Sequence, residues 1–306
     1  MTSVDISTKI LGVKLRNPTI LASGIVGISG AACCYAAKNG AGAVVPKSIG
    51  PREREGHNNP ILVEFKGGFL NAVGLPNAGI DNSLGEIEFA MKNAGVPVIP
   101  SIFGGTKEEF GMVAEKMSAL KPQMIEVNLS CPNTASDFGE AFALSEKAAA
   151  DVIRIVKSKT KVPIIAKLGP NVPSIKRIAK AVEEAGADAI SAINTMPGMV
   201  IDVRTAQPVL HNKQGGISGP ALKPIAVNCI YDVYEVVKIP IIGMGGVTTG
   251  EDAVEMIMAG AVAVQIGTAI YYRGIDVFRK VTDEVRQFME ENGYGKISDM
   301  IGIAHK

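Results

Sequence analysis

Histidine, cysteine and tryptophan are scarce in this chain of 306 residues, which has three histidines, four cysteines and no tryptophan. The histidines stand far apart and have no metal-ligand spacing with cysteines or carboxylates. The cysteines include no CxxC pair of the kind found in zinc sites and redox dithiols. We therefore expect no metal in this chain. The residues concerned are Cys33, Cys34, Cys131, Cys229, His57, His211 and His305.

An excess of charge of either sign is also absent, because 31 basic residues face 30 acidic ones and leave a formal charge of +1. Without a basic block that could grip phosphate backbones, nucleic acid is not an expected partner. No apolar run reaches the roughly 18 residues of a membrane span. Residues 1–11 mix charged and hydroxyl side chains and lack the pattern of a secretory signal. We expect a cytoplasmic protein that does not associate with a membrane.

Short apolar segments, each followed by a helical pattern, recur along the chain. Their lack of polar alternation predicts strands that are buried on both faces, as in a parallel sheet covered by helices. Eight such units fit a (β/α)8 TIM barrel better than an open doubly wound sheet, and barrels of this length form one domain, here residues 1–306. The predicted strands are Thr19–Ala22, Gly42–Lys47, Val96–Phe103, Met124–Leu129, Pro163–Leu168, Ala189–Asn194, Ile239–Met244 and Ala261–Ile266.

Capping signals and long insertions complete this outline. Thr106 and Glu109 have the spacing of a capping box, Ser145 ahead of Ala148–Val156 resembles one more weakly, and Gly186 and Gly260 fit helix ends. Excursions rich in Gly, Pro and Asn follow the second and sixth strands, at 50–84 and 195–219, and a shorter loop follows the fourth. In a barrel such loops lie at the C-terminal face and build the active site.

Polar and glycine residues end the predicted strands and so converge on one rim. Lys47 and Lys167 have few carboxylates near them in the strand-end pattern, Glu126 being the main candidate, so we expect the lysines to await an anionic ligand. Glycines after strands seven and eight lie where barrels commonly hold phosphate, although either pair alone would fit a tight turn. The strand-end residues are Ser23, Lys47, Ser48, Ser101, Asn128, Lys167, Asn194, Gly245, Gly246, Gly267 and Thr268.

Cys131 lies in the sharpest motif, Asn128-Leu129-Ser130-Cys131-Pro132-Asn133 after the fourth strand. A loop cysteine near lysines can have a lowered pKa and act as a general base, with Asn128 and Asn133 orienting a substrate. An inert cysteine packed under the loop is the commoner alternative. A thiol nucleophile is less favoured, because no histidine base accompanies it at the strand ends.

Five motifs resemble the dihydroorotate dehydrogenase family almost from end to end: PKS at 46–48, NAVGLPN at 71–77, NLSCPN at 128–133, INTMPGMVID at 193–202 and GGISGPALKP at 215–224. Cysteine at position 131 resembles the soluble class 1 enzymes, and the 211–224 region resembles subclass 1B. The resemblance implies FMN as cofactor and oxidation of dihydroorotate to orotate in pyrimidine biosynthesis. Cys131 would take a proton from carbon 5 while a hydride leaves carbon 6, and Lys167 would lie at the pyrimidine edge of the flavin.

The resemblance also implies two sets of contacting residues. The FMN set is Ser23, Lys47, Ser48, Ser101, Asn128, Lys167, Ile193, Gly219, Gly245, Gly246, Gly267 and Thr268, with serine at 101 where asparagine is more usual. The substrate set is Lys47, Asn71, Val73, Gly74, Leu75, Asn128, Asn133, Asn194 and Thr195.

Partners follow from the resemblance as well. Subclass 1B implies a homodimer joined by an electron-transfer subunit that carries FAD and a 2Fe-2S cluster, giving a heterotetramer that reduces NAD+. A class 1A enzyme using fumarate and a dihydropyrimidine dehydrogenase-like flavoenzyme stay open as alternatives. A phosphate-binding barrel without flavin is the remote alternative from another functional class.

Overall fold

The computed structural model describes residues 4–129 and 145–306. Its centre is an eight-stranded parallel sheet in the order β4-β3-β18-β17-β12-β11-β10-β9. Isolated parallel bridges from Val44 in β4 to Val98, and from Ile49 to Ile102 in β9, link the two chain segments that contain the edge strands, so the sheet closes on itself. The strands are β3 (Thr19–Leu21), β4 (Ala43–Val44), β9 (Ser101–Ile102), β10 (Ile125–Asn128), β11 (Ile164–Leu168), β12 (Ala189–Ala192), β17 (Ile241–Met244) and β18 (Ala261–Ile266).

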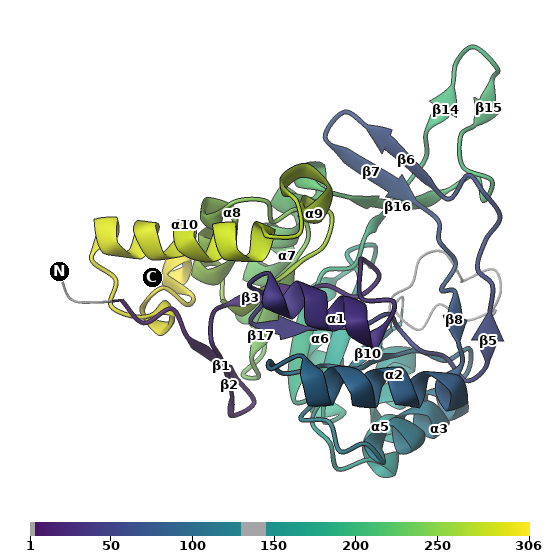
Figure 1. Ribbon diagram of the computed structural model, residues 1–306, viewed down its shortest axis with the longest axis horizontal. Helices are drawn as coiled ribbons and strands as arrows, with labels where there is room; N and C mark the ends of the chain where they lie inside the picture. Colours follow the sequence, from purple (N-terminus) through teal and green to yellow (C-terminus); the bar gives the residue numbers. More distant parts are fainter. Residues whose placement is uncertain (1–3, 130–144) are drawn as a thin grey trace.

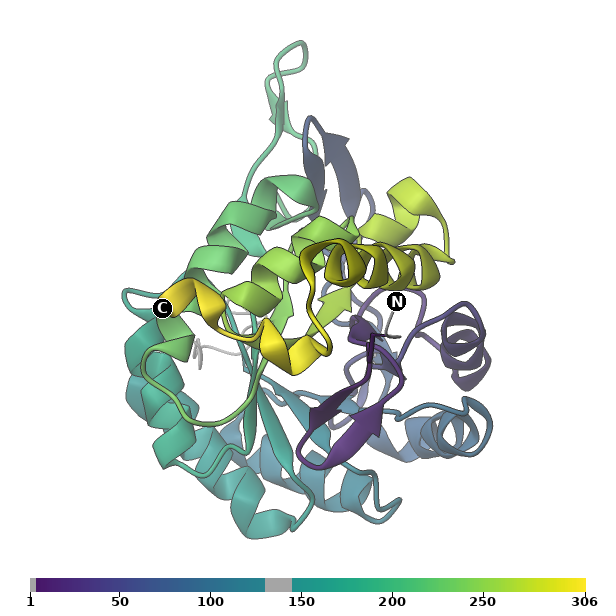
Figure 2. The same cartoon turned by 90° about the vertical axis from the view of Figure 1, so that its left-hand side faces the viewer.

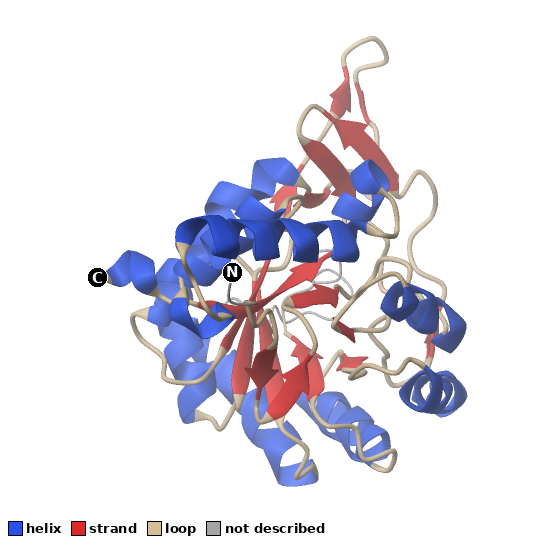
Figure 3. Ribbon diagram, turned by 60° about the vertical axis from the view of Figure 1, so that its left-hand side comes forward, coloured by secondary structure: helices blue, strands red, loops and turns tan. Residues whose placement is uncertain are grey.

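Helices surround this central sheet, as Figures 2 and 3 show. Each barrel strand is followed by a helix that packs an apolar face onto the strands, which produces the expected (β/α)8 barrel. All eight predicted strand segments contain an observed barrel strand. The helices are α1 (Gly30–Lys38), α2 (Ile80–Asn93), α3 (Lys107–Ser118), α5 (Glu146–Lys159), α6 (Ile175–Glu184), α7 (Lys223–Tyr234), α8 (Gly250–Met258), α9 (Ala269–Arg273) and α10 (Val277–Asn292). Short 3-10 turns are η2 (Pro220–Leu222), η3 (Ile297–Asp299) and η4 (Ile303–His305).

The helix ends follow the sequence signals, except for the second half of the two predicted capping boxes. The Ser145 hydroxyl accepts from the Ala148 N–H at 3.4 Å, and Gly186 and Gly260 adopt φ of +100° and +127° directly after their helices. Both predicted capping boxes are wrong in their second half, and at Ser145 the residue in the third helical position, Ala148, has no side chain that could accept a hydrogen bond. Thr106 accepts from Glu109 N, but the Glu109 carboxylate turns to the N–H of Gly105 at 2.8 Å.

An N-terminal hairpin, β1 (Thr8–Ile10) and β2 (Val13–Leu15), closes the bottom of the barrel. Ile10 and Leu15 are fully buried and pack against inward-facing barrel residues that include Met124 and Ile165. The lower interior of the barrel is therefore a packed apolar plug, and any cavity must open at the other end.

The two long excursions were expected as loops, but the structure pairs them in one antiparallel sheet, β13-β16-β7-β6. The first excursion supplies β6 (Leu62–Phe65) and β7 (Gly68–Asn71), and the second supplies β13 (Met196–Gly198) and β16 (Gly215–Ser218). Figure 1 shows this sheet rising beyond the barrel, with the hairpin β14 (Ile201–Asp202) and β15 (Gln207–Pro208) at its tip. A second pair, β5 (Glu53–Arg54) and β8 (Asn77–Ala78), lies in the first excursion.

None of the helices in the described ranges is long and apolar enough to cross a membrane.

Candidate active site

A cavity of about 510 Å³ lies at the C-terminal ends of the barrel strands. Its floor and sides come from residues that end β3, β10, β11, β12, β17 and β18. Its outer wall comes from the antiparallel sheet, through residues such as Leu62, Phe69 and Asn71. The cavity therefore occupies the position where barrels of this type place their active sites.

Most residues expected from the sequence line this one cavity, although they come from segments as far apart in the chain as Ser23 and Thr268. Its lining includes Ser23, Lys47, Ser48, Asn71, Val73, Gly74, Leu75, Asn128, Lys167, Ile193, Asn194, Thr195, Gly219, Gly245, Gly246, Gly267 and Thr268. Ser101 is placed differently: it is fully buried one layer below, against Ser48 and Glu126. Cys131 and Asn133 lie outside the described residues.

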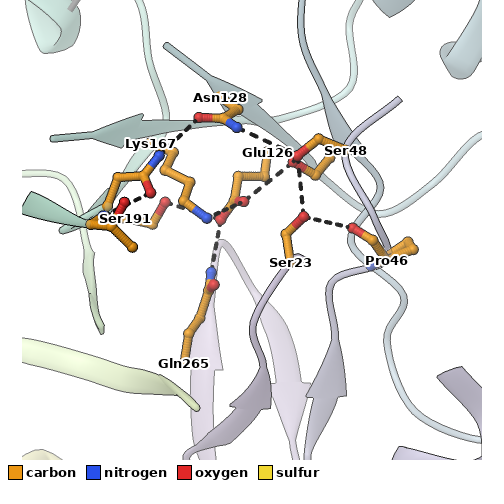
Figure 4. Close-up of polar contacts among 11 residues, drawn as sticks. Ser23, Pro46, Ser48, Glu126, Asn128, Lys167, Ser191 and Gln265 are labelled. Carbon is orange, nitrogen blue, oxygen red and sulfur yellow. Dashed lines mark hydrogen bonds and ion pairs between the residues drawn. The ribbon is translucent and has the colours of Figure 1, made fainter. Parts of the chain in front are cut away.

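Below the cavity lies a polar layer inside the barrel, centred on Glu126 (Figure 4). The carboxylate of Glu126, which is 0% exposed, accepts hydrogen bonds from Gln265 Nε2 at 2.8 Å and Ser191 Oγ at 3.0 Å. The Ser101 hydroxyl lies 3.4 Å from its other oxygen. Three neutral donors thus help to offset the desolvation of a buried carboxylate.

Lys167 completes this layer. Its ammonium lies 3.5 Å from Glu126 Oε1, and both side chains are almost fully buried. Lys167 thus pairs with the carboxylate that the sequence offered as the main candidate, and binding of an anionic ligand by the strand-end lysines stays a prediction. The pair forms because β10 and β11 are adjacent, which brings two inward-facing side chains of neighbouring strands together. Lys167 still lines the cavity, so its charge faces both Glu126 and the cavity contents.

A chain of hydroxyls connects the polar layer to the cavity wall. Ser101 Oγ lies 2.8 Å from Ser48 Oγ, which lies 3.1 Å from Ser23 Oγ. Ser23 in turn donates to the carbonyl of Pro46 at 3.0 Å (Figure 4). The amide of Asn128 reaches Ser48 at 3.5 Å. These hydrogen bonds fix the orientation of the side chains before a ligand binds.

Amide side chains occupy the upper walls. The Asn71 amide donates to the carbonyl of Gly216 at 3.0 Å, which ties it to the facing strand β16. Asn194 Nδ2 lies 3.4 Å from Asn128 Oδ1, and Asn194 Oδ1 accepts from the Thr195 N–H at 2.8 Å. Amides supply both donors and acceptors, which suits a ligand whose ring carries carbonyl and N–H groups.

Glycines form a narrow backbone cradle after β17. Gly246 has φ of +82°, and a Cβ there would lie 2.8 Å from Lys223 Cβ and 2.9 Å from the carbonyl oxygen of Gly219. Gly245 also has positive φ, at +118°. Only glycine fits this backbone without strain, and the absence of a side chain brings the main chain to the cavity wall.

Asp252 on α8 anchors the next turn of this loop. Its carboxylate accepts from the N–H groups of Thr248 and Thr249 at 2.9 and 2.8 Å and pairs with Lys223 at 2.8 Å. Burial alone would raise the pKa of Asp252, but the Lys223 ammonium and the two N–H groups outweigh it and lower the pKa below its ordinary value.

The cysteines and metal-ligand types give no second site within 4–129 and 145–306. No cluster of three or more His, Cys, Asp or Glu side chains that could hold a metal ion occurs there. Burial raises the pKa of Cys33 to about 12 and that of Cys229 to about 11, so both are inert thiols at neutral pH.

Ser191 and Gln265 were missed at the sequence level, and Glu126 was considered only as a partner for the lysines. A two-residue period would have found them, because each lies two positions after a residue of the apolar plug: Ala189, Ala263 and Met124. Since side chains of a strand alternate between faces, these positions must also point into the barrel.

Comparison with known proteins identifies the family. The family model of dihydroorotate dehydrogenase matches residues 5–289. Proteins named "Dihydroorotate dehydrogenase B (NAD(+)), catalytic subunit" are similar over nearly the whole chain: 49% identity in Methanosarcina acetivorans (96% of this chain, 94% of that protein) and 47% in Methanocaldococcus jannaschii (98% of each). A crystal structure of DHODH in complex with ferulenol from Eimeria tenella shares the fold, with a TM-score of 0.85 at 23% identity over 99% of this chain and 89% of that chain. The chain therefore belongs to the dihydroorotate dehydrogenase family, as its motifs predicted.

Proposed function

We propose that this chain is the catalytic subunit of an NAD+-linked dihydroorotate dehydrogenase, which oxidises (S)-dihydroorotate to orotate for pyrimidine biosynthesis. The observation that carries the proposal is the convergence of four motifs on one cavity. Lys47 from PKS, Asn71 from NAVGLPN, Asn128 from NLSCPN and Asn194 from INTMPGMVID all line it. A cation and three amides suit a planar ring that carries a carboxylate and two amide groups.

The residues present fit FMN as the cofactor. The cavity of about 510 Å³ lies within the range of small-molecule and cofactor sites, roughly 300–1,000 Å³. Its glycine cradle after β17, with Gly267 and Thr268 after β18, suits the phosphate. The Oε1 atom of Gln265 is buried without a hydrogen-bond partner in the part of the chain that the structure describes. A flavin ring, which carries both donors and acceptors, is a suitable partner for such an atom.

When bound, FMN would supply the acceptor for the hydride that leaves carbon 6 of dihydroorotate. Lys47 and the asparagine amides would bind the substrate carboxylate and ring amides, and so fix the ring in one orientation. Cys131, outside the described residues, is the proposed general base that removes the proton from carbon 5. The loop residues Val73, Gly74 and Leu75, which line the cavity, would contact the substrate ring.

Lys167 is the proposed catalytic cation at the cofactor. Glu126 contacts the Lys167 ammonium from below, and Lys167 lines the cavity floor. A positive charge at this place would stabilise the negative charge that develops on the cofactor above it. Ser23, Ser48 and Ile193 would contact the cofactor beside it, with Ser101 supporting Ser48 from below.

A separate electron-transfer subunit is part of the proposal. The relatives are named as catalytic subunits of an NAD(+) enzyme. This chain's cysteines lack the spacing that holds an iron-sulfur cluster. We therefore place FAD and a 2Fe-2S cluster in a partner chain, within a heterotetramer built on a homodimer of this single-domain barrel in the cytoplasm.

The test is anaerobic stopped-flow absorbance at the oxidised-flavin band, with dihydroorotate mixed against the purified chain and against Cys131→Ala. We expect a yellow protein that bleaches, and a yellow variant that bleaches at least a hundredfold more slowly, within the range for loss of a general base, about 10²–10⁴. A colourless wild-type protein contradicts the proposal. Bleaching by dihydrouracil alone would assign the other substrate, and turnover with fumarate but not with NAD+ and a partner chain would assign class 1A.

A further inference from the structure

Glu126 is a buried carboxylate whose effect on the cofactor the proposed function leaves open beyond its contact with Lys167. It lies inside the barrel beneath the cavity, is 0% exposed, and is absent from the residues that line the cavity. A carboxylate in such a place is costly unless it is paired and hydrogen-bonded. The layer below, which includes Met124 two residues earlier, is filled by apolar side chains. Replacing a whole buried ion pair by well-packed apolar side chains often leaves stability unchanged or raises it, so stability alone does not account for the charged pair in this layer.

The contacts of Glu126 lead upward to the cofactor site. Lys167 and Gln265 both touch its carboxylate, and both also line the cavity. The Lys167 ammonium is 3.5 Å from Oε1 and the Gln265 amide nitrogen is 2.8 Å from Oε2. One carboxylate thus positions a cation and an amide that border the cavity floor (Figure 4).

The charge of Glu126 also decides how the Gln265 amide is turned. A carboxylate accepts hydrogen bonds and cannot donate one, so the amide must present Nε2 to it. The opposite end, Oε1, is buried without a hydrogen-bond partner within the described residues. Gln265 is thereby held as an unsatisfied acceptor at the site, a state that a ligand N–H would relieve.

We propose that Glu126 is a positioning residue of the flavin site: it orients Lys167 and Gln265 and sets how much of the lysine's positive charge acts on the bound flavin. This inference rests on the proposed function. Glu126→Gln would take away a negative charge 3.5 Å from the Lys167 ammonium. The flavin would then become easier to reduce, because reduction adds negative charge near the cation.

The main test compares the flavin midpoint potential of the wild-type chain and Glu126→Gln by anaerobic dye-coupled reduction. We expect the variant's reduction equilibrium constant to rise at least tenfold, a shift of about 30 mV to more positive potential for a two-electron couple. Asp188→Asn is the matched control. It also removes a carboxylate from an ion pair, with Lys157 at 2.8 Å, but at the start of β12 and away from the cavity, so its potential should not change.

A second variant tests the same idea without removing a charge. Ser191 donates to Glu126 at 3.0 Å and does not line the cavity, so we expect Ser191→Ala to act on the flavin through the carboxylate. Loss of this donor leaves the negative charge less offset, and we expect the equilibrium constant to fall about threefold, or about 14 mV. A fall in the potential of Ser191→Ala, opposite to the rise in Glu126→Gln, is not expected if both substitutions merely loosen the packing of the site. Ser191→Ala removes a single hydroxyl, so the test remains possible if Glu126→Gln does not fold.

The outcomes separate the two proposals. A wild-type chain that contains flavin and is reduced by dihydroorotate, with unchanged potentials in both variants, overturns the role of Glu126 alone. A rise in potential in Ser191→Ala overturns it as well. A wild-type chain without flavin contradicts the proposed function and this inference together.

Discussion

Asp252 is predicted to stabilise the loop that forms the glycine cradle, and Asp252→Ala should show this. The substitution removes two hydrogen bonds, from Thr248 N at 2.9 Å and Thr249 N at 2.8 Å, to a side chain that is 15% exposed. Hydrogen bonds to charged groups contribute about 1.5–3 kcal/mol each. Lys223 keeps a partner in Glu255 at 2.7 Å, so loss of its pair with Asp252 adds little. Taking the lower value for each bond, we expect a loss of about 3 kcal/mol.

The pH dependence of this loss has a definite sign. The pKa of Asp252 is lowered in the folded state, so its contribution is present above the unfolded pKa of about 3.9 and disappears as pH falls through the lower folded value. The difference between wild type and variant should therefore be complete at pH 7 and shrink below about pH 4.

Thermal unfolding followed by circular dichroism measures the effect. At about 2 °C per kcal/mol, the lower value for sizeable domains, Tm should fall by about 6 °C at pH 7. The control is Asp283→Ala on α10, whose carboxylate is 59% exposed and pairs only with Arg286 at 2.9 Å among the described residues. It should change stability by less than about 0.5 kcal/mol. An unchanged Tm in Asp252→Ala, or a difference that grows on acidification, would refute the reasoning.

Three further predictions concern the cradle, the substrate cation and the buried thiols. Gly246→Ala should lower the flavin content of the purified protein, because its Cβ would lie 2.8 Å from Lys223 at a φ of +82°; full flavin occupancy would contradict this. Lys47→Ala should raise KM for dihydroorotate at least tenfold with a smaller change in flavin content, and an unchanged KM would remove Lys47 from the substrate site. Cys33 and Cys229, with pKa values raised by burial to about 12 and 11, should resist alkylation at pH 8 in the folded protein and react after denaturation, as peptide mass spectrometry can measure.

The barrel was predictable because its strands are buried on both faces and therefore appear as apolar runs. The run 163–168, for example, contains β11 at Ile164–Leu168, and its following helix begins after Ser174. The strand-end residues were predictable for the same reason, since parallel strands bring their C-terminal ends to one rim. The positions of the barrel strands and their ends depend on burial against a common core, and burial is visible in the sequence as local apolar composition.

The sheet over the barrel mouth was not predictable by the same means. β7 pairs with β16, and their partners Asn71 and Gly216 are far apart in the chain. Glycine and proline lie in or next to these strands, and neither residue favours a strand. Their pairing depends on tertiary contacts, such as Leu70 and Leu210 in a small separate core. Local propensity carries little information about strands of this kind.

The polar layer inside the barrel also depends on tertiary contacts and not on local composition. A lone Lys167 in an apolar strand is compatible with a ligand contact or with a structural ion pair, and the sequence gives no means of choosing between them. The structure shows that the two roles are compatible, because Lys167 contacts Glu126 below and borders the cavity above. A barrel interior filled from below by Ile10, Leu15 and their neighbours leaves one open end. Lys167, two residues after Ile165 of the apolar plug, is therefore buried and still borders the cavity. This geometry allows a side chain without ligand contact, such as Glu126, to act on the chemistry above it.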